Sequence, residues 1–253
     1  MRFAVIVPVY NEIRLLEKSI ARLTQCPAPV DPGSGPIERL VIIVDDGSTD
    51  GTTEVVRRLG ESAGIHVHLQ SVNQGKGAAV RRGLSIAAES GVDFAIIHDA
   101  DLEYDPADHA IMLAPLLDGR ADAVIGSRFL GQTHRVLYFW HYVVNRFLTF
   151  VSNMLTNLNL TDMECCLKAF SIDVVERLEL HEDRFGFEPE IVAQLSKIRL
   201  PVHEPELPQK ERALRIYEVA VSYAGRTFEE GKKIRWTDGV EAIVVIIRRN
   251  LFG

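Results

Sequence analysis

Asp99 and Asp101, separated by one alanine, are the residues of this chain best placed to hold a metal ion. They follow a short apolar run, residues 94–98, that is typical of a buried strand. At the turn after such a strand, two carboxylates at this spacing can point at one cation, and hard oxygen ligands suit Mg²⁺ or Mn²⁺. These ions commonly bind through one or two carboxylates together with substrate phosphates. Since the pattern also occurs in solvated turns, its interpretation depends on the residues around it.

Groups able to bind a nucleoside follow the two apolar runs nearest the N-terminus. Tyr10 offers a ring that can stack on a base, and Glu12 can bind a base or ribose edge or serve as a first-turn acid of a helix. Asp45 and Asp46 can accept hydrogen bonds from a ribose or base, as an acid does in dinucleotide-binding folds, or can belong to a turn and helix cap. Both sets predict a nucleotide site, with a purely structural role as the alternative.

Two further motifs bear on phosphate binding. Arg128 follows an apolar run at residues 123–125 and can bind a phosphate bidentately or form an ion pair. The segment Asn-Gln-Gly-Lys-Gly at residues 73–77 lacks the Walker pattern, which excludes a P-loop NTPase. No G-x-G-x-x-G is present either, which weighs against a nicotinamide or flavin oxidoreductase.

Apolar runs and helical spacing alternate along the chain. Strands are expected at residues 3–9, 40–44, 65–69, 94–98, 123–125 and 216–221. Helices are expected at residues 12–23, 52–59, 76–88, 134–158 and 241–250, and loops at 27–36 and 200–213. This order predicts an α/β fold, a Rossmann-like, doubly wound and mostly parallel sheet flanked by helices. Ligands bind such sheets at the carboxyl ends of the strands, where the polar groups above are expected.

Composition narrows the class of protein. The chain has 253 residues, of which 47% are hydrophobic, enough for one large domain. The formal net charge of −7 argues against binding of nucleic acid. The three cysteines, two of them adjacent, indicate no disulfide framework and favour a reducing compartment. The N-terminus has no signal-peptide pattern, and no uninterrupted apolar stretch approaches the roughly 18 residues of a membrane span. We therefore expect a cytoplasmic protein.

Taken in order, five motifs resemble those of family 2 glycosyltransferases with the GT-A fold. They are Val-Pro-Val-Tyr-Asn-Glu, Val-Asp-Asp-Gly-Ser-Thr-Asp-Gly-Thr, Asn-Gln-Gly-Lys-Gly, Asp-Ala-Asp and Gly-Ser-Arg. Segments 160–168, 184–188 and 225–234 are most similar to the branch of dolichyl- and polyprenyl-phosphate mannose and glucose synthases. The resemblance covers nearly the whole chain and implies a single GT-A catalytic domain over residues 1–253. Residues 1–130 would hold the nucleotide sugar, and residues 131–253 would form the acceptor side and end in a helix.

The resemblance also implies roles for individual residues. Pro8, Tyr10, Glu12 and Asp46 match positions that hold the nucleoside, and Asp45 and Lys76 are grouped with them. Asp99, Asp101 and Glu103 match a site for Mg²⁺ or Mn²⁺. Arg128 and Arg226 match basic residues near the phosphates, and Asp162 and Lys168 match the acceptor-side motif. The candidate catalytic residues are therefore Asp101, Arg128, Asp162, Lys168 and Arg226.

The implied reaction is inverting transfer of a hexose from a UDP- or GDP-sugar, with a metal ion stabilising the leaving diphosphate. A polyprenyl phosphate acceptor is already ionised near neutral pH, since the second pKa of a phosphate monoester is about 6. It needs no strong base, only cations such as Lys168 and Arg226 to seat it. A saccharide hydroxyl needs a general base, and Asp162 is then the natural choice. The resemblance favours the lipid-linked phosphate over the saccharide.

Two other classes are weaker alternatives. A non-catalytic nucleotide-sugar-binding module would not need both the metal and the acceptor motifs. A nucleotidyltransferase would need a Gly-rich basic loop after the first strand, where this chain has Tyr10-Asn11-Glu12.

Aromatic residues are frequent between residues 134 and 158. Trp and Tyr suit a membrane interface, where one end of the ring is wet, but they also pack into protein cores. A lipid-linked acceptor would bring the protein into peripheral contact with the cytoplasmic face of a membrane.

Overall fold

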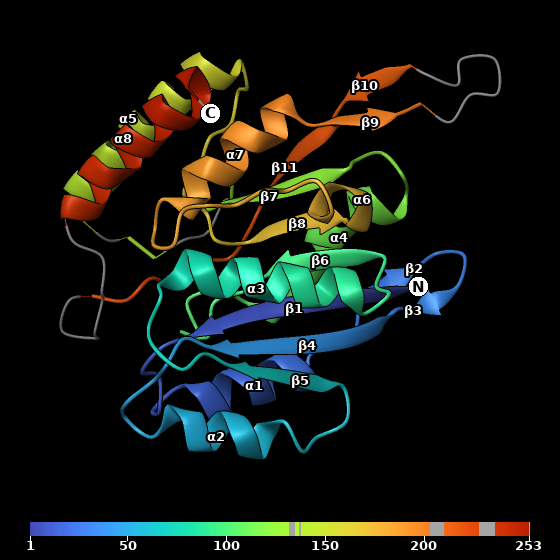
Figure 1. Cartoon of the computed structure of the whole chain (residues 1–253). Helices are drawn as coiled ribbons and strands as arrows, with labels where there is room; N and C mark the ends of the chain where they lie inside the picture. Colours follow the sequence, from blue (N-terminus) through green and yellow to red (C-terminus); the bar gives the residue numbers. More distant parts are fainter. Residues whose placement is uncertain (132–134, 137, 203–209, 228–235, 253) are drawn as a thin grey trace.

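The computed structural model describes residues 1–131, 135–136, 138–202, 210–227 and 236–252 (Figure 1). Its main sheet has the strand order β11-β7-β8-β6-β1-β4-β5. The strands are β1 (Arg2–Val9), β4 (Glu38–Asp45), β5 (Ile65–Leu69), β6 (Phe94–Ile97), β7 (Ala123–Ser127), β8 (Lys168–Ser171) and β11 (Ile216–Ala220). All neighbours pair in parallel except β8, which runs antiparallel to both β6 and β7. The predicted α/β architecture with a mostly parallel sheet is confirmed.

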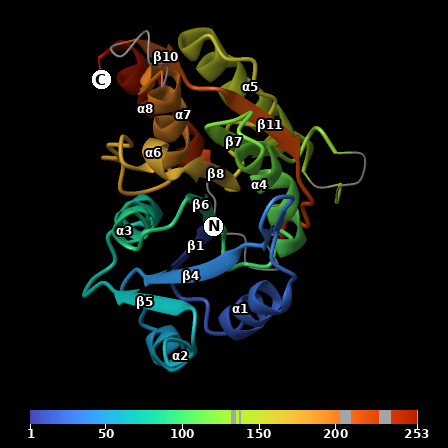
Figure 2. The same ribbon diagram turned by 90° about the vertical axis from the view of Figure 1, so that its right-hand side faces the viewer.

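Helices cover both faces of this sheet (Figure 2). They are α1 (Leu16–Gln25), α2 (Thr52–Leu59), α3 (Lys76–Glu89), α4 (His109–Leu117), α5 (Phe139–Thr156), α6 (Ile172–Val175), α7 (Phe187–Lys197) and α8 (Trp236–Leu251), with a 3₁₀ turn at Pro106–Asp108. Helices α3, α6 and α7 lie on one face, and α1 and α4 lie on the other. Helices α5 and α8 contact each other and α7 (Figures 1 and 2). No helix of the described part is long and apolar enough to cross a bilayer.

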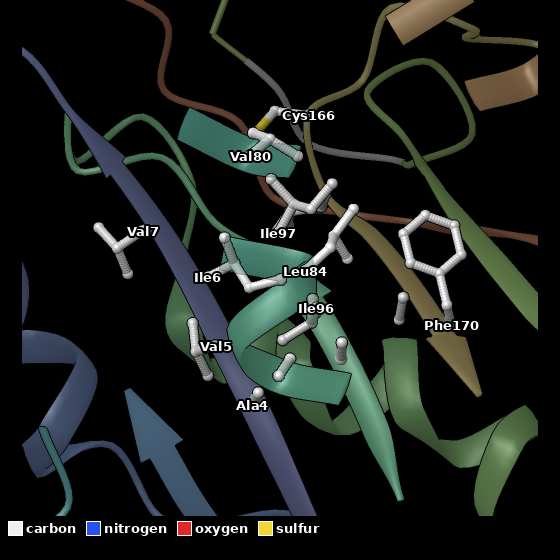
Figure 3. Close-up of a cluster of buried hydrophobic side chains, with 14 of the residues drawn as sticks. Ala4, Val5, Ile6, Val7, Val80, Leu84, Ile96, Ile97, Cys166 and Phe170 are labelled. Carbon is white, nitrogen blue, oxygen red and sulfur yellow. The ribbon is translucent and has the colours of Figure 1, made fainter. Parts of the chain in front are cut away.

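The core forms because the central strands are apolar on both faces, as parallel strands covered by helices must be. Residues 3–9 of β1 are all buried, and so are the last six residues of β4. Side chains of β1, β6 and β8 meet α3 in one cluster, in which Ile6, Leu84, Ile96 and Phe170 are labelled in Figure 3. This packing fixes the positions at which the strands end, and therefore the positions of the polar groups that follow them.

The sequence patterns missed several elements. Strand β8 and helices α4, α6 and α7 are absent from the sequence-based prediction, which treats residues 162–168 and 184–188 only as site motifs and assigns no element to residues 109–117. The expected loop at 27–36 contains a short hairpin of β2 (Val30–Asp31) and β3 (Gly35–Pro36). The expected loop at 200–213 begins and ends in the paired strands β9 (Arg199–Pro201) and β10 (Glu211–Ala213), and residues 203–209 lie outside the described part. Two-residue and three-residue strands carry too little periodicity to be recognised.

Gly77, at the start of α3, allows a close approach between this helix and the chain that leads to α7. A Cβ atom at Gly77 would lie 2.1 Å from the carbonyl oxygen of Glu182 and 2.9 Å from that of Arg184. Because both are backbone atoms, no rotamer change relieves the clash. We expect Gly77→Ala to lower the free energy of unfolding by about 1–3 kcal/mol, despite the better helix propensity of alanine.

Urea titration of the wild type and Gly77→Ala measures this change. Gly33→Ala is the matched control, since its Cβ would meet only the Asp31 Oδ2 atom, at 3.4 Å. Equal stability of the two variants would contradict the packing described here.

Candidate active site

The carboxylates of the Asp-Ala-Asp motif lie just beyond the carboxyl end of β6. Asp101 accepts a hydrogen bond from the backbone N–H of Glu103 through Oδ1, at 3.0 Å. Between them, Leu102 has a φ of 64°, a left-handed conformation that side chains other than glycine seldom adopt. The turn places the side chains of Asp101 and Glu103 within reach of the same group, the guanidinium of Arg226. Backbone strain of this kind is common at functional sites.

Lys76 pairs directly with Asp99. Its Nζ atom lies 2.7 Å from Asp99 Oδ2 and 5.4 Å from the ring centroid of Phe187. Burial opposes ionisation of Asp99, but the charge and hydrogen bond of Lys76 outweigh it and lower the pKa of Asp99. The motif predicts that Lys76 belongs to the nucleotide site, and this stays a prediction. In the structure Lys76 holds the first aspartate of the motif ionised and in place.

Asp101 is in a different electrostatic position. Burial, and then the negative charges of Asp99 and Glu103, raise the pKa of Asp101 to about 7, although Arg226 acts in the opposite direction. A bound cation would remove this repulsion. Asp99 and Asp101 supply hard carboxylate oxygens at one strand end, and this donor set fits Mg²⁺ or Mn²⁺ completed by substrate phosphates.

Glu103, the third predicted metal ligand, is engaged elsewhere. Its Oε1 accepts hydrogen bonds from the backbone N–H and Nε of Arg226, at 3.0 and 2.9 Å, and its Oε2 accepts one from the Tyr223 hydroxyl at 2.7 Å. Within the described residues, no group of three or more His, Cys, Asp and Glu side chains is arranged to hold a metal ion. In the structure Glu103 anchors Arg226, and metal binding by Asp99, Asp101 and Glu103 stays a prediction.

Arg226 is the predicted phosphate-binding residue from the C-terminal motif. Its Nη2 lies 3.0 Å from Asp101 Oδ2, and its Nη1 lies 3.9 Å from a carboxylate oxygen of Glu12. It therefore joins the metal side of the site to the nucleoside side. Residues 228–234 of the same motif lie outside the described residues.

The predicted nucleoside-binding residues gather at the ends of β1 and β4. Pro8 is buried in β1, while Tyr10 just beyond it is 39% exposed. Asp45 accepts hydrogen bonds from Ser48 and Thr53. Asp46 accepts backbone hydrogen bonds from Gln74 and Gly75, both at 2.8 Å. Both aspartates are almost completely buried. Their hydrogen bonds stabilise the loops around the site.

Arg128 and Asp162, at the predicted acceptor side, form a buried bidentate pair. Arg128 donates from Nε to Asp162 Oδ2 at 2.6 Å, from Nη2 to Oδ1 at 2.7 Å, and from its backbone N–H to Oδ2 at 3.0 Å. With its amide correctly oriented, Asn145 adds a fourth donor to Asp162, at 3.3 Å. A carboxylate has about four acceptor positions, so Asp162 is saturated. This geometry does not support the predicted role of Asp162 as a general base.

Lys168 lies at the start of β8 and is fully buried. Its ammonium donates hydrogen bonds to Glu188 on α7 and to the carbonyl oxygen of Cys165. It is therefore unavailable to seat an acceptor, contrary to the sequence-based expectation. Glu188 itself was missed by the sequence analysis, because its helix was not predicted.

Glu164 was also missed. It lies between Asp162 and Lys168, and the sequence offered one signal, an acidic residue two positions after Asp162. Its Oε1 atom is buried and, in the described part of the chain, accepts no hydrogen bond. Burial and the nearby Glu188 carboxylate raise the pKa of Glu164 to about 7, while Lys168 and Arg128 act against them.

Paired aspartates beside basic groups, at the carboxyl end of a mostly parallel sheet, define the class of nucleotide-sugar-dependent transferases with the GT-A fold. The family model for glycosyl transferase family 2 matches residues 4–179, and the chain belongs to this family.

Three named proteins illustrate the similarity. An undecaprenyl-phosphate mannosyltransferase of Micrococcus luteus is 27% identical over 99% of this chain and 95% of its own length. A dolichyl-phosphate beta-glucosyltransferase of Drosophila melanogaster is 29% identical over 81% of this chain and 65% of its own length. A glycosyltransferase of Haloferax volcanii is 33% identical, but the match covers 62% of this chain and 49% of that protein.

A solved structure extends the comparison to the fold. Glucosyl-3-phosphoglycerate synthase of Mycobacterium tuberculosis superposes with a TM-score of 0.66 over 99% of this chain and 81% of that chain, at 18% identity. Structures of that enzyme contain uridine diphosphate with Mn²⁺ or with Mg²⁺. At this identity the likeness supports the GT-A fold alone.

The raised pKa of Glu164 predicts a pH-dependent stability. Between its ordinary value of 4.5 and about 7, the folded chain holds a proton on Glu164 that the unfolded chain has lost. Stability therefore falls as pH rises through this window. The charged groups that act on Glu164 are Glu188, Lys168, Arg128 and Asp162. Glu164→Gln removes the titration, so we expect this variant to gain stability relative to the wild type between about pH 5 and about pH 8.

Urea titrations of both proteins across this pH range measure the effect. Asp101 titrates in the same window but is present in both proteins, so its contribution cancels. Glu176→Gln, at an exposed position, is the control. A constant difference between Glu164→Gln and the wild type across the range would contradict the prediction.

Proposed function

We propose that this protein transfers a hexose from a UDP- or GDP-sugar to the phosphate of a polyprenyl phosphate, with inversion at the anomeric carbon. The observation that carries this proposal is the double character of α5. One face contacts residues 160–168, which we call the acceptor segment. Arg146 donates to the carbonyl oxygen of Thr161 at 3.1 Å, and Asn153 donates to that of Leu160 at 2.8 Å. The other face is apolar and exposed. In this proposal a lipid lies along this face with its phosphate at Arg128, whose Nη2 lies 2.7 Å from the side chain of Asn145 on the same helix.

The names of relatives support the same acceptor class, since several act on undecaprenyl, polyprenol or dolichyl phosphates. In this proposal, residues 1–130 hold the donor and residues 131–253 form the acceptor side. Pro8, Tyr10 and Glu12 contact the nucleoside, while Asp45 and Asp46 hold the loops around it.

The proposed donor chemistry centres on the leaving diphosphate. A Mg²⁺ or Mn²⁺ ion held by Asp99 and Asp101 would act as a Lewis acid that stabilises the charge developing there. Arg226 already contacts Asp101 and is placed to add positive charge next to the same phosphates. Lys76 keeps Asp99 ionised and correctly oriented.

On the acceptor side, the phosphate oxygen is its own nucleophile. With a second pKa of about 6, a phosphate monoester is ionised at neutral pH and needs no base. This suits a site in which Asp162 is saturated by Arg128 and Asn145. Arg128 keeps 15% of its side chain exposed and lies against this segment, so in this proposal it meets the acceptor phosphate.

Transfer to a saccharide hydroxyl is the second candidate. It requires a general base, and Glu164 has a carboxyl oxygen without a protein partner in the described residues. A pKa of about 7 also suits a base.

Turnover measurements separate the two candidates. With UDP-glucose or GDP-mannose and Mn²⁺, we expect product with undecaprenyl or dolichyl phosphate and none with simple saccharides. Asp101→Asn is expected to lower kcat by about 100-fold or more, because it removes charge stabilisation of the leaving group, and EDTA is expected to stop the reaction. Turnover with a saccharide but with no lipid phosphate would overturn the proposal in favour of the second candidate.

Because the proposed acceptor is a lipid, the protein would bind peripherally to the cytoplasmic face of a membrane. The surface formed by α5 and α8 exposes a set of large apolar side chains: Phe139, Trp140, Tyr142, Val144, Phe147, Phe150 and Met154 on α5, and Val240, Val244, Ile247 and Leu251 on α8. We call this the α5–α8 surface. The 18 residues of α5 contain no acidic side chain that would repel an anionic lipid. Exposed apolar side chains concentrated on two contacting helices are typical of an interaction site.

Sedimentation with vesicles of phosphatidylcholine and phosphatidylglycerol tests this surface. Trp140 is 72% exposed and Phe147 is 53% exposed, so the double variant Trp140→Glu with Phe147→Glu should fold normally. We expect it to bind vesicles at least about tenfold more weakly, since each buried apolar side chain is worth about 1.5–3 kcal/mol.

Val30→Glu, on β2 and away from the α5–α8 surface, is the control. Unchanged vesicle binding by the double variant would contradict the membrane role. Conversion of a dimer to a monomer by the same variant would reassign the surface to contacts between copies of the chain.

A further inference from the structure

Glu164 has an unsatisfied oxygen close to the reacting groups. Its Oε1 atom is buried, and no donor in the described residues reaches it. A buried acceptor without a partner costs about 1–3 kcal/mol, and native proteins contain few of them. The residue as a whole is of intermediate exposure although Oε1 itself is buried, so a ligand that meets this oxygen must displace neighbouring atoms or turn the carboxyl group. We therefore expect a group of a substrate to donate the missing hydrogen bond to this oxygen.

The charges around Glu164 limit what that partner can be. Lys168 is paired with Glu188, and Arg128 is paired with Asp162, so both neighbouring cations already have carboxylate partners. A phosphate group would be repelled by the carboxylates of Glu164 and Glu188. A neutral hydroxyl can donate a hydrogen bond without adding charge. The chemistry of the position therefore fits a polyhydroxylated, uncharged group.

The position of Glu164 along its segment identifies which hydroxyls can reach it. Two residues before it, Asp162 pairs with Arg128 on the acceptor side. Two residues after it, the thiol of Cys166 lies close enough to the Asp99 carboxylate on the metal side for each to shift the pKa of the other. The segment thus passes from one side of the reaction to the other, with Glu164 at its middle. In any glycosyl transfer, the sugar lies between the leaving diphosphate and the nucleophile.

We propose that Glu164 accepts a hydrogen bond from a hydroxyl of the transferred sugar and thereby helps to select the donor. The inference rests on the proposed function in one respect, the use of a nucleotide-sugar donor. It does not depend on the identity of the acceptor. It also gives Glu164 a role other than that of the general base required by transfer to a saccharide.

Calorimetric binding in the presence of Mn²⁺ tests the inference without an acceptor. UDP is compared with UDP-glucose, and GDP with GDP-mannose, so that each pair differs only in the sugar. Glu164→Ala should weaken binding of the sugar nucleotide by about 10- to 100-fold, as expected for a hydrogen bond to a charged group, and leave the diphosphate unchanged. Glu164→Gln, which keeps a carbonyl acceptor, should lose less. Glu176→Ala is the exposed control.

A series of UDP-deoxyglucoses, or GDP-deoxymannoses if GDP-mannose is the donor, then locates the hydroxyl. The analogue that lacks it should bind the wild type as weakly as the complete donor binds Glu164→Ala, and Glu164→Ala should not distinguish the two. If thermal unfolding shows that Glu164→Ala is not folded, the same comparison is made with Glu164→Gln, which should show reduced discrimination.

The outcomes distinguish failure of the role proposed for Glu164 from failure of the proposed function. An equal loss for diphosphate and sugar nucleotide, or no loss for either, would overturn the role of Glu164 and leave the proposed function standing. Failure of the wild type to bind either diphosphate would overturn the proposed function and this inference with it.

Discussion

Carboxylates converge at the carboxyl ends of the strands, and the structure neutralises most of them with cations from other elements. Asp99 is paired with Lys76 of α3, Asp162 with Arg128 after β7, and Glu188 with Lys168 of β8. Removing one partner of a buried pair typically costs 3–5 kcal/mol, because it leaves an uncompensated charge. The site therefore depends on the fold. Helices α3 and α7 and strands β6, β7 and β8 must all be in place before these buried carboxylates have their cationic partners.

Strand β8 brings the acceptor segment into this arrangement. It enters the sheet antiparallel between β6 and β7, so that residues 161–167 cross the ends of the two strands that carry the Asp-Ala-Asp motif and Arg128. The charge pairs then divide the site. Lys76 and Arg226 hold the metal-side carboxylates, whereas Arg128 and Asn145 fill the acceptor positions of Asp162. The Oε1 atom of Glu164, between the two sides, is buried and has no hydrogen-bond donor in the described residues.

Helix α5 connects this site to the outside of the molecule. Its polar residues Asn145, Arg146 and Asn153 bind the acceptor segment, while the α5–α8 surface is apolar and exposed. The same helix thus links the site chemistry to a surface of the kind that contacts lipid. The aromatic residues at positions 138–150, which could equally have packed into the core, are exposed instead.

The α/β class, the strand ends that bear the site, and the paired aspartates followed from the sequence, because buried parallel strands are continuous apolar runs and ligands bind where such strands end. Tertiary structure decided what the charged residues do. The motif predicts that Lys76 binds nucleotide, and the structure pairs it with Asp99; Lys168, expected to seat the acceptor, is buried against Glu188. Glu103, expected to bind metal, hydrogen-bonds to Arg226. A motif specifies which groups are present, but the partner of each charge comes from an element that is distant in the chain. Only packing brings the two together, and the cost of burying an unpaired charge then determines which groups remain available to a ligand.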